Sequence, residues 1–301
     1  MYDIIIIGGG PGGLTAAIYL ARKKMKILVL TDDFGGQAAK AATVENYPGV
    51  AKIAGFELIA KMKEQIDELK VENEVLKVTE VTQKETNFEV KTADKNFETK
   101  SVIVASGKTP RLLNVPGEKE YLGKGIGYCV TCDGPLFQNK SVAIIGGGNS
   151  CLDSALEMEK YAAKIYLVNV NEEFQGDMIR VEKVKKSPKI EIIAEAKTTG
   201  FEGEQFLKKL LYENKAGEKK EILVDGAFVE IGWEPAAEIV QDLVELNDLK
   251  EIKIDTENKT KTPGIFAAGD VTEITQKQIV IAAGEGAKAA LNAWKYVVMK
   301  K

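Results

Sequence analysis

The chain has 301 residues, a length that favours two domains, and its 45% hydrophobic and 29% charged residues are typical of globular proteins. It contains no histidine, which excludes Ser-His-Asp and Cys-His nucleophiles and histidine-ligated zinc. With 41 Lys and Arg against 45 Asp and Glu, the net charge of −4 does not favour a nucleic-acid partner.

The chain starts with an apolar run that ends in glycines. Residues 3–10 predict a buried parallel strand, and residues 14–30 predict a helix followed by a second strand. The glycines between them match the dinucleotide-binding fingerprint at Gly8, Gly10 and Gly13. In that fingerprint the glycines permit a tight turn, close approach of a pyrophosphate and close packing of helix on strand. A Rossmann-like unit is therefore expected, with a glycine turn that binds no ligand as the alternative.

A second glycine box follows a second apolar run. Residues 141–151 again lead a strand into glycines, and residues 152–160 and 164–170 predict the helix and the next strand. The third fingerprint position is Cys151, which is small but is not glycine. The fold is expected to survive this change, with Cys151 as a buried packing residue.

Further strands and helices are expected between and after the two boxes. Residues 56–70 have helical spacing, residues 75–104 alternate like antiparallel strands, and residues 101–107 predict a strand that returns to the first sheet. Residues 190–231 are rich in strand-forming segments.

The last elements predicted are a buried strand at residues 264–270 and a helix at residues 278–296. The expected fold class is therefore α/β, with two Rossmann-like dinucleotide-binding domains, the second inserted into the first. Residues 1–116 and 241–301 are expected to form the first domain, and residues 117–240 the second.

Three cysteines are too few for a disulfide scaffold, and the N-terminal apolar run is too short for a signal peptide or a membrane span. A cytoplasmic location is expected, where a close cysteine pair indicates redox or metal chemistry. Cys129 and Cys132 form such a CxxC pair, in which one thiol pKa is typically lowered. No metal ion is expected, because zinc needs two further ligands and the other cysteine lies in a predicted helix.

Together these motifs resemble the low-molecular-weight thioredoxin reductases over essentially the whole chain. The matching segments are residues 8–13, 35–37, 45–49, 129–134, 146–151, and 264–270 with 277–279. One such motif alone is a weak signal, but these six occur in the order of the family.

The resemblance implies a homodimer and FAD, bound by the first domain. The residues implied to bind FAD are Gly8, Gly10, Gly13, Thr31, Gly36, Gln37, Asn46, Gly269, Asp270, Gln278 and Ile279. Gln278 and Ile279 would lie against the isoalloxazine. Asp270 as the N-cap of the last helix and Asn46 as a turn residue are structural alternatives.

The resemblance also assigns the redox residues. Cys132 is implied to be the sulfur that meets the flavin, and Cys129 to exchange with the substrate disulfide, which is that of thioredoxin. Asp133 is implied to be the acid-base group for departing thiolates. Because Asp133 precedes a Gly-Pro pair, it is also typical of a turn.

One segment departs from the NADPH-dependent members, which carry a His-Arg-Arg cluster and a further arginine after the second strand of the second domain. Residues 169–176 here contain no cation and two carboxylates, Glu172 and Glu173. NADPH is therefore not expected as the donor, because repulsion replaces the attraction that holds its 2′-phosphate. NADH needs an acid near the ribose, which Glu172 or Glu173 would supply; Asn169, nearer the usual position, is a weak substitute.

Family members without these arginines include the ferredoxin-dependent flavin thioredoxin reductases, which this sequence resembles most. The expected function is electron transfer from reduced ferredoxin through FAD and the cysteine pair to thioredoxin. An NADH-linked or other-flavin-linked reductase and a flavin-bearing redox sensor without turnover are the alternatives. Ferredoxins are usually acidic, so a basic docking surface is expected. The candidates, which as lysine runs are more often solvated faces, are Lys183, Lys185, Lys186 and Lys189, and Arg22, Lys23, Lys24 and Lys26.

Overall fold

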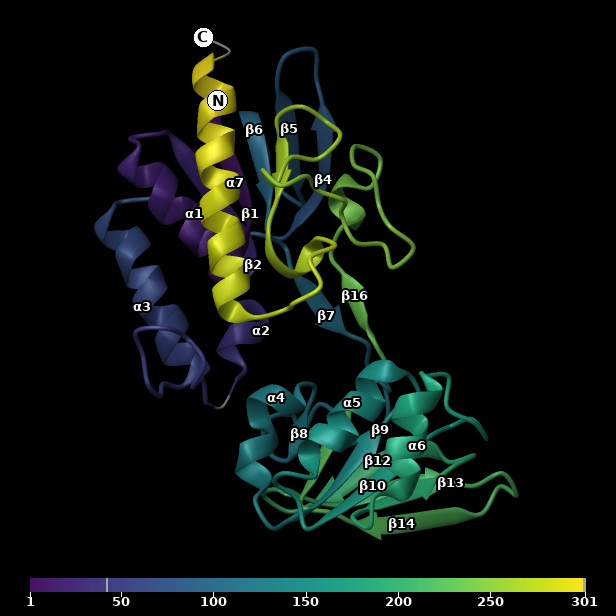
Figure 1. The fold of residues 1–301 in the computed structure, drawn as a ribbon. Helices are drawn as coiled ribbons and strands as arrows, with labels where there is room; N and C mark the ends of the chain where they lie inside the picture. Colours follow the sequence, from purple (N-terminus) through teal and green to yellow (C-terminus); the bar gives the residue numbers. More distant parts are fainter. Residues whose placement is uncertain (42, 300–301) are drawn as a thin grey trace. The chain divides into compact units, whose positions relative to one another are not determined.

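The computed structural model describes residues 1–41 and 43–299, and the chain forms two compact units (Figure 1). Unit 1 consists of Met1–Thr109 and Glu234–Lys301, and unit 2 of Pro110–Trp233. The second unit is therefore inserted into the first, as the two glycine boxes predict. None of the helices in the described part of the chain is long and apolar enough to cross a membrane.

Unit 1 is built on a seven-stranded sheet with the order β3-β2-β1-β6-β5-β4, and β17 also pairs with β6. Neighbouring strands are parallel from β3 to β6 and between β6 and β17, whereas β4, β5 and β6 form the expected antiparallel meander. The strands are β1 (Tyr2–Gly9), β2 (Ile27–Phe34), β3 (Glu72–Val75), β4 (Val78–Gln83), β5 (Phe88–Thr92), β6 (Asn96–Val104) and β17 (Ile265–Ala267).

Both faces of this sheet are covered, which explains the unbroken isoleucine run of β1. Ile4 and Ile6 contribute to the core under the helices, whereas Ile5 and Ile7 face a second core that includes residues 237–254. Helices α1 and α3 pack together, and α7 lies along α1 (Figure 1). The helical segments are α1 (Pro11–Arg22), α2 (Gly36–Ala39), α3 (Gly55–Glu68), η2 (Glu238–Val240), η3 (Gly269–Val271) and α7 (Ile279–Met299).

Unit 2 contains a five-stranded parallel sheet in the order β11-β10-β9-β15-β8 and a three-stranded antiparallel sheet, β12-β13-β14. Val142 and Ile144 of β9 face the core with the helices, and Ala143 and Ile145 face the core with the antiparallel sheet. The strands are β8 (Ile126–Gly127), β9 (Ser141–Ile145), β10 (Lys164–Val168), β11 (Ile190–Ile193), β12 (Lys197–Gly203), β13 (Leu207–Glu213), β14 (Lys219–Leu223) and β15 (Gly226–Val229). The helical segments are α4 (Val130–Asp133), η1 (Gly134–Phe137), α5 (Asn149–Met158) and α6 (Met178–Lys186).

The two crossings between the units lie seven residues earlier than the sequence suggests, at 109/110 instead of 116/117 and at 233/234 instead of 240/241. They are formed by β7 (Lys108–Pro110) and β16 (Trp233–Pro235), which pair with each other. Pro116 belongs to unit 2 because its carbonyl accepts the N–H of Phe201 at 3.0 Å. Val240 is buried in a core of unit 1.

The tightest helix packing in unit 1 gives a testable prediction. A Cβ on Gly286 of α7 would lie 2.0 Å from the carbonyl oxygen of Gly12 on α1, so Gly286→Ala forces the two helices apart. We expect it to destabilise the protein by about 1–3 kcal/mol, measured as a lower midpoint of thermal unfolding. Gly284→Ala is the matched control, since no described atom lies within 4 Å of a Cβ there. It should leave stability unchanged or raise it by up to about 1 kcal/mol.

Candidate active site

The first glycine turn lies at the carboxyl end of the unit 1 sheet, between β1 and α1. Gly8 has a φ of +117°, and a Cβ there would lie 2.2 Å from the carbonyl oxygen of Ala105 on the neighbouring chain segment. A Cβ on Gly13 would lie 1.9 Å from the carbonyl oxygen of Gly8. These two glycines are therefore required by the fold itself.

Gly10 has a different role, because its surroundings are open. The nearest atom to a Cβ there is the carbonyl oxygen of Gly35, at 4.0 Å. No described side chain caps α1 at Gly10, so its first N–H groups are left for a ligand. An open main chain at a helix N-terminus suits a pyrophosphate, and these residues therefore fit FAD.

The second half of β2 and the residue after it shape the turn from the other side. The Thr31 hydroxyl accepts the N–H of Gly9 at 2.9 Å and donates to the carbonyl of Asp33, so this side chain is engaged within the chain. The Gly35 N–H donates to Gly9 at 2.9 Å. Asp32, the residue after Thr31, and Asp33 are exposed acids. In dinucleotide-binding folds, a carboxylate in this part of the second strand binds a ribose diol. Both aspartates belong to residues 31–37, which the resemblance places around the ADP and flavin parts of FAD, and an acid about 20 residues after the fingerprint is the expected signal.

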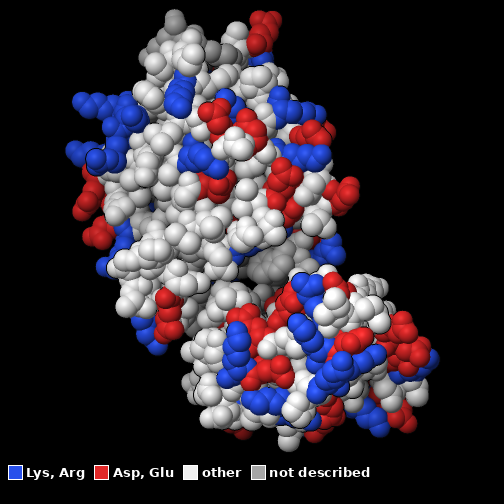
Figure 2. Space-filling view, in the orientation of Figure 1, with Lys and Arg blue, Asp and Glu red and all other residues white. Residues whose placement is uncertain are grey.

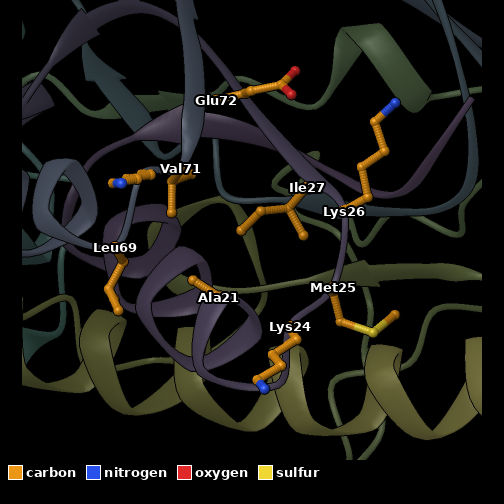
Figure 3. A pocket seen from close by; sticks show the side chains of 9 residues that line it. Ala21, Lys24, Met25, Lys26, Ile27, Leu69, Val71 and Glu72 are labelled. Atoms are coloured by element: carbon orange, nitrogen blue, oxygen red, sulfur yellow. The ribbon is translucent and has the colours of Figure 1, made fainter.

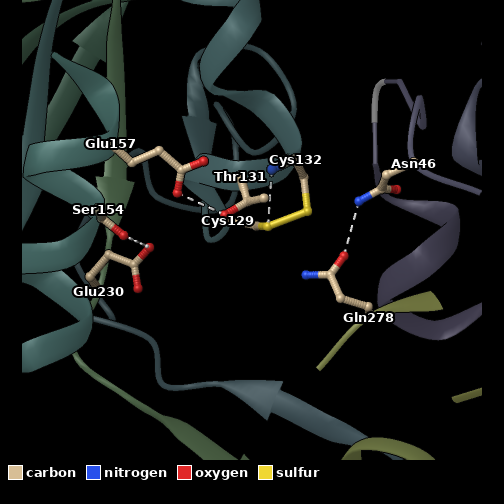
Figure 4. The surroundings of a disulfide bond; sticks show 8 residues. All are labelled: Asn46, Cys129, Thr131, Cys132, Ser154, Glu157, Glu230 and Gln278. Carbon is tan, nitrogen blue, oxygen red and sulfur yellow. Dashed lines mark hydrogen bonds between the residues drawn. A yellow bond between two sulfur atoms is a disulfide. The ribbon is translucent and has the colours of Figure 1, made fainter. Parts of the chain in front are cut away.

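The remaining residues implied to bind FAD lie in three segments of unit 1. The Asn46 amide donates to Oε1 of Gln278 at 3.0 Å, which joins segments far apart in the sequence (Figure 4). Gly36 and Gln37 begin the short helix α2, and no described atom lies within 4 Å of a Cβ on Gly36. Ile279 is the first residue of α7 and packs against the helix-side core.

A buried charge cluster surrounds Asp270 in η3. Burial raises the pKa of Asp270, whereas Lys277 and Lys108 lower it. Lys277 donates to the carbonyl of Asp270 at 3.3 Å and lies 3.3 Å from the Glu251 carboxylate, which also pairs with Lys108. The N-cap alternative for Asp270 is wrong, because α7 begins at Ile279. Sequence reasoning missed Lys108 and Glu251, since neither belongs to a motif.

Unit 2 holds the redox pair. Cys129 and Cys132 form a disulfide across α4 (Figure 4). Cys129 is the N-cap of this helix, and its Sγ accepts the N–H of Cys132 at 3.2 Å. Asp133 ends α4 with a half-buried side chain, and its Oδ2 would lie 3.2 Å from a Cβ on Gly127 of β8. Cys151 is buried in α5, where burial and then Glu230 raise the pKa of its thiol. It is therefore a packing residue.

The second glycine turn keeps the shape of the first. A Cβ on Gly146 would lie 2.4 Å from the carbonyl oxygen of Glu230, and no described atom lies within 4 Å of one on Gly148. The Gln175 N–H donates to Gly147 at 2.8 Å, as Gly35 does to Gly9 in unit 1.

The residue that corresponds to Thr31 is Asn169, which is fully buried. Its Oδ1 would lie 2.6 Å from a Cβ on Gly147, and its amide donates to the carbonyl of Glu173 at 3.0 Å. The position that corresponds to Asp32 is therefore Val170, whose side chain is 62% exposed. Where unit 1 has an exposed acid after Thr31, unit 2 therefore has an exposed apolar residue after Asn169.

The charges around this loop are carboxylates, Arg180 and Lys215, which pairs with Glu195 at 2.5 Å and lies within electrostatic range of Glu172. Glu172 and Glu173 are exposed. Arg180, the first cation after the loop, pairs with Asp153 at 2.7 Å and with Asp177 at 3.3 Å. The arginine is therefore held by two carboxylates of its own chain.

Comparisons with known proteins agree with this architecture. The model of the family described as pyridine nucleotide-disulphide oxidoreductase matches residues 2–290. Among curated proteins, the F component of the alkyl hydroperoxide reductase of Staphylococcus epidermidis is 38% identical over 300 residues. That match covers 99% of this chain but 59% of the relative, so the chain spans about three fifths of the relative's length.

Solved structures of thioredoxin reductases match over nearly the whole chain. The enzyme from Streptococcus pyogenes has a TM-score of 0.93 at 33% identity and covers 99% of both chains. The enzyme from Lactococcus lactis has a TM-score of 0.71 at 38% identity and covers 99% of this chain and 100% of its own. Together with the two glycine turns and the redox disulfide, these matches show that the chain belongs to the pyridine nucleotide-disulphide oxidoreductase family, with the thioredoxin reductase fold and FAD as its cofactor.

Proposed function

We propose that this protein is a flavin-dependent thioredoxin reductase that takes electrons from reduced ferredoxin and not from a pyridine nucleotide. The observation that carries the proposal is the CxxC disulfide on α4, beside a second nucleotide fold that lacks the charges for NADPH. The flavin residues proposed are Gly8, Gly10, Gly13, Gly36, Gln37, Asn46, Gly269, Asp270, Gln278 and Ile279. Thr31 would act through Gly9. A cytoplasmic location and a homodimer stay predictions.

The dithiol chemistry is assigned from the local geometry of α4. Cys129 at the N-cap, with the Cys132 N–H directed at its sulfur, is the better stabilised thiolate and therefore the nucleophile. Its attack on the thioredoxin disulfide forms a mixed disulfide and expels one thioredoxin thiolate, which Asp133 would protonate. Cys132 then attacks Cys129, the thioredoxin leaves as a dithiol, and the Cys129–Cys132 disulfide re-forms. FAD, when bound, supplies the electron pair that reopens this disulfide.

The donor is argued from charge. Residues 169–176 carry Glu172 and Glu173. The nearby cations are already paired within the chain, Arg180 with Asp153 and Asp177 and Lys215 with Glu195, so a 2′-phosphate would meet repulsion there. NADH would find Val170 at the position held by Asp32 in unit 1. Since flavins accept electrons singly as well as in pairs, a one-electron protein donor such as ferredoxin fits these constraints.

Neither basic segment is assigned to the donor. Lys24 and Lys26, with Lys70, line a cavity of about 240 Å³ at the amino end of the unit 1 sheet (Figure 3). An eight-residue strand rises about 26 Å, so this surface lies a full strand from the first glycine turn. Figure 2 shows Lys and Arg over this end of α1 but mixed charges over unit 2. On α6, Lys186 pairs with Glu182, and the nearby Lys189 donates to main-chain carbonyls.

An NADH-linked reductase is the second candidate, favoured by the exposed carboxylates of Glu172 and Glu173 and by the open main chain at Gly148. Anaerobic flavin absorbance with NADPH, NADH and reduced ferredoxin in turn separates the candidates. We expect bleaching by ferredoxin alone, and recovery when oxidised thioredoxin is added. Rapid bleaching by NADPH would contradict the proposed donor, and bleaching by NADH alone would favour the second candidate.

A trapping experiment distinguishes the roles of the two cysteines. The probe is thioredoxin that lacks its resolving cysteine and carries a nitrothiobenzoate group on the other. Cys132→Ser should accumulate a mixed disulfide with this probe on a non-reducing gel, because Cys129 still attacks, whereas Cys129→Ser should not. Both variants should lose turnover, and Cys151→Ala should keep it because that thiol is buried. Trapping by Cys129→Ser but not by Cys132→Ser would reverse the assignment.

Asp270 provides a test of the flavin site. Asp270→Asn removes a partly buried charge beside Lys277 and Lys108, and we expect FAD to dissociate about 10–100-fold more readily, as loss of a charged hydrogen bond implies. Equilibrium dialysis against apoprotein measures the affinity. Asp248→Asn, an exposed acid of unit 1, is the control and should bind FAD normally. Equal affinities in both variants would remove Asp270 from the site.

A further inference from the structure

Two hydrogen bonds in unit 2 lie between the CxxC helix and the second glycine turn. Thr131, which lies between the two cysteines, donates its hydroxyl hydrogen to Oε2 of Glu157 at 2.9 Å. Ser154 donates its hydroxyl hydrogen to Oε1 of Glu230 at 2.9 Å. Figure 4 shows the two hydrogen bonds one above the other, with Thr131 beside the disulfide. Neither carboxylate belongs to a sequence motif described above.

The fold fixes the position of both carboxylates. Ser154 and Glu157 lie three residues apart on α5 and therefore on one face of the helix, and α4 packs against α5. Glu230 directly follows β15, where its N–H donates to the carbonyl of Ile145 at 2.8 Å. The strand end and the helix thus bring Glu230 to Ser154 and within electrostatic range of Glu157.

The surroundings of Glu230 make its charge sensitive to pH near neutrality. Burial raises the pKa of Glu230 to about 7; the Ser154 hydrogen bond opposes this rise and the Glu157 carboxylate adds to it. From α5 it also faces Cys151, whose thiol has a raised pKa and stays neutral. The turn after β9 contacts Glu230 through main-chain atoms. The Arg111 side chain lies against Gly232, two residues after Glu230.

We propose that the carboxylates of Glu157 and Glu230, as positioning residues, make the Cys129–Cys132 dithiol a stronger reductant. Reduction with two electrons and one proton opens the disulfide to a Cys132 thiol and a Cys129 thiolate. The Glu157 carboxylate accepts from Thr131, between the two cysteines, and Glu230 lies within electrostatic range of Glu157. Their negative charges would destabilise the reduced form, since like charges repel. A destabilised reduced form gives up its electrons more readily. This inference rests on the proposed function for the redox role of the dithiol.

The test needs neither ferredoxin nor thioredoxin. The full-length flavoprotein is equilibrated without oxygen in a fixed mixture of reduced and oxidised dithiothreitol, acid-quenched, alkylated and weighed. Dithiothreitol gives two electrons and one proton to the disulfide, releases its second proton to the solvent and becomes a cyclic disulfide. We expect Glu230→Gln to raise the ratio of reduced to oxidised protein about three- to tenfold near pH 8.5. Near pH 6 the difference should fall below about twofold, because Glu230 is then protonated in the parent protein.

Glu157→Gln keeps an oxygen that accepts from Thr131 and removes the charge, so it should also raise the ratio near pH 8.5. Glu159→Gln is the matched control: this carboxylate, next to α5, accepts from Ser187 instead, and its loss should leave the ratio unchanged. If Glu230→Gln does not fold, Ser154→Ala replaces it. Loss of the Ser154 hydrogen bond should raise the pKa of Glu230, so the carboxylate should begin to affect the ratio of reduced to oxidised protein at a higher pH.

If Glu157→Gln and Glu230→Gln both have the parent protein's ratio of reduced to oxidised protein at every pH, the inference is overturned and the proposed function is not affected. A rise of the same size in Glu159→Gln would also overturn the inference, because the effect would then be one of net charge. A disulfide that dithiothreitol cannot open in any variant would contradict both the inference and the proposed function.

Discussion

Both units depend on one steric constraint, the close approach of main chain to main chain where the first parallel strand turns into a helix. In unit 1 the main chain at Gly8 passes so near Ala105 that a Cβ would lie 2.2 Å from its carbonyl oxygen; in unit 2 Gly146 stands in the same relation to Glu230. This closure brings a helix N-terminus to the carboxyl end of each sheet. The cofactor site of unit 1 and the position of the CxxC helix in unit 2 follow from it.

The two glycine turns have nearly the same geometry, yet the side chains exposed beside them differ in charge. Each is braced by a side chain at the end of the second strand, Thr31 in unit 1 and Asn169 in unit 2. The next residue is an exposed aspartate in one unit and an exposed valine in the other. The packing of each turn depends on its glycines, whereas the chemistry beside the turn depends on residues of the second strand that can differ without altering that packing.

Buried charge has been accommodated differently in the two units. In unit 1, Glu251 is 5% exposed and is paired with Lys108 and Lys277, so the charges compensate one another beside Asp270. In unit 2, Glu230 is held by the neutral hydroxyl of Ser154 and faces another carboxylate, which explains its raised pKa. The first arrangement supports a constant charge, whereas the second supports a charge that changes with pH.

The sequence by itself determined the α/β class, the two glycine turns, the inserted second domain and the CxxC pair, because each depends on residues close together in the chain. The missing cations of residues 169–176 could be identified for the same reason. The tertiary structure alone decided the domain boundaries, since the packing of Pro116 and Val240 depends on distant partners. It also decided the hydrogen bond of Thr31 with Gly9, the lysine pair around Glu251, and the contact of Thr131 with Glu157. These contacts join segments from separate strands and helices, and no local pattern encodes which of many charged side chains will meet once the sheets have formed.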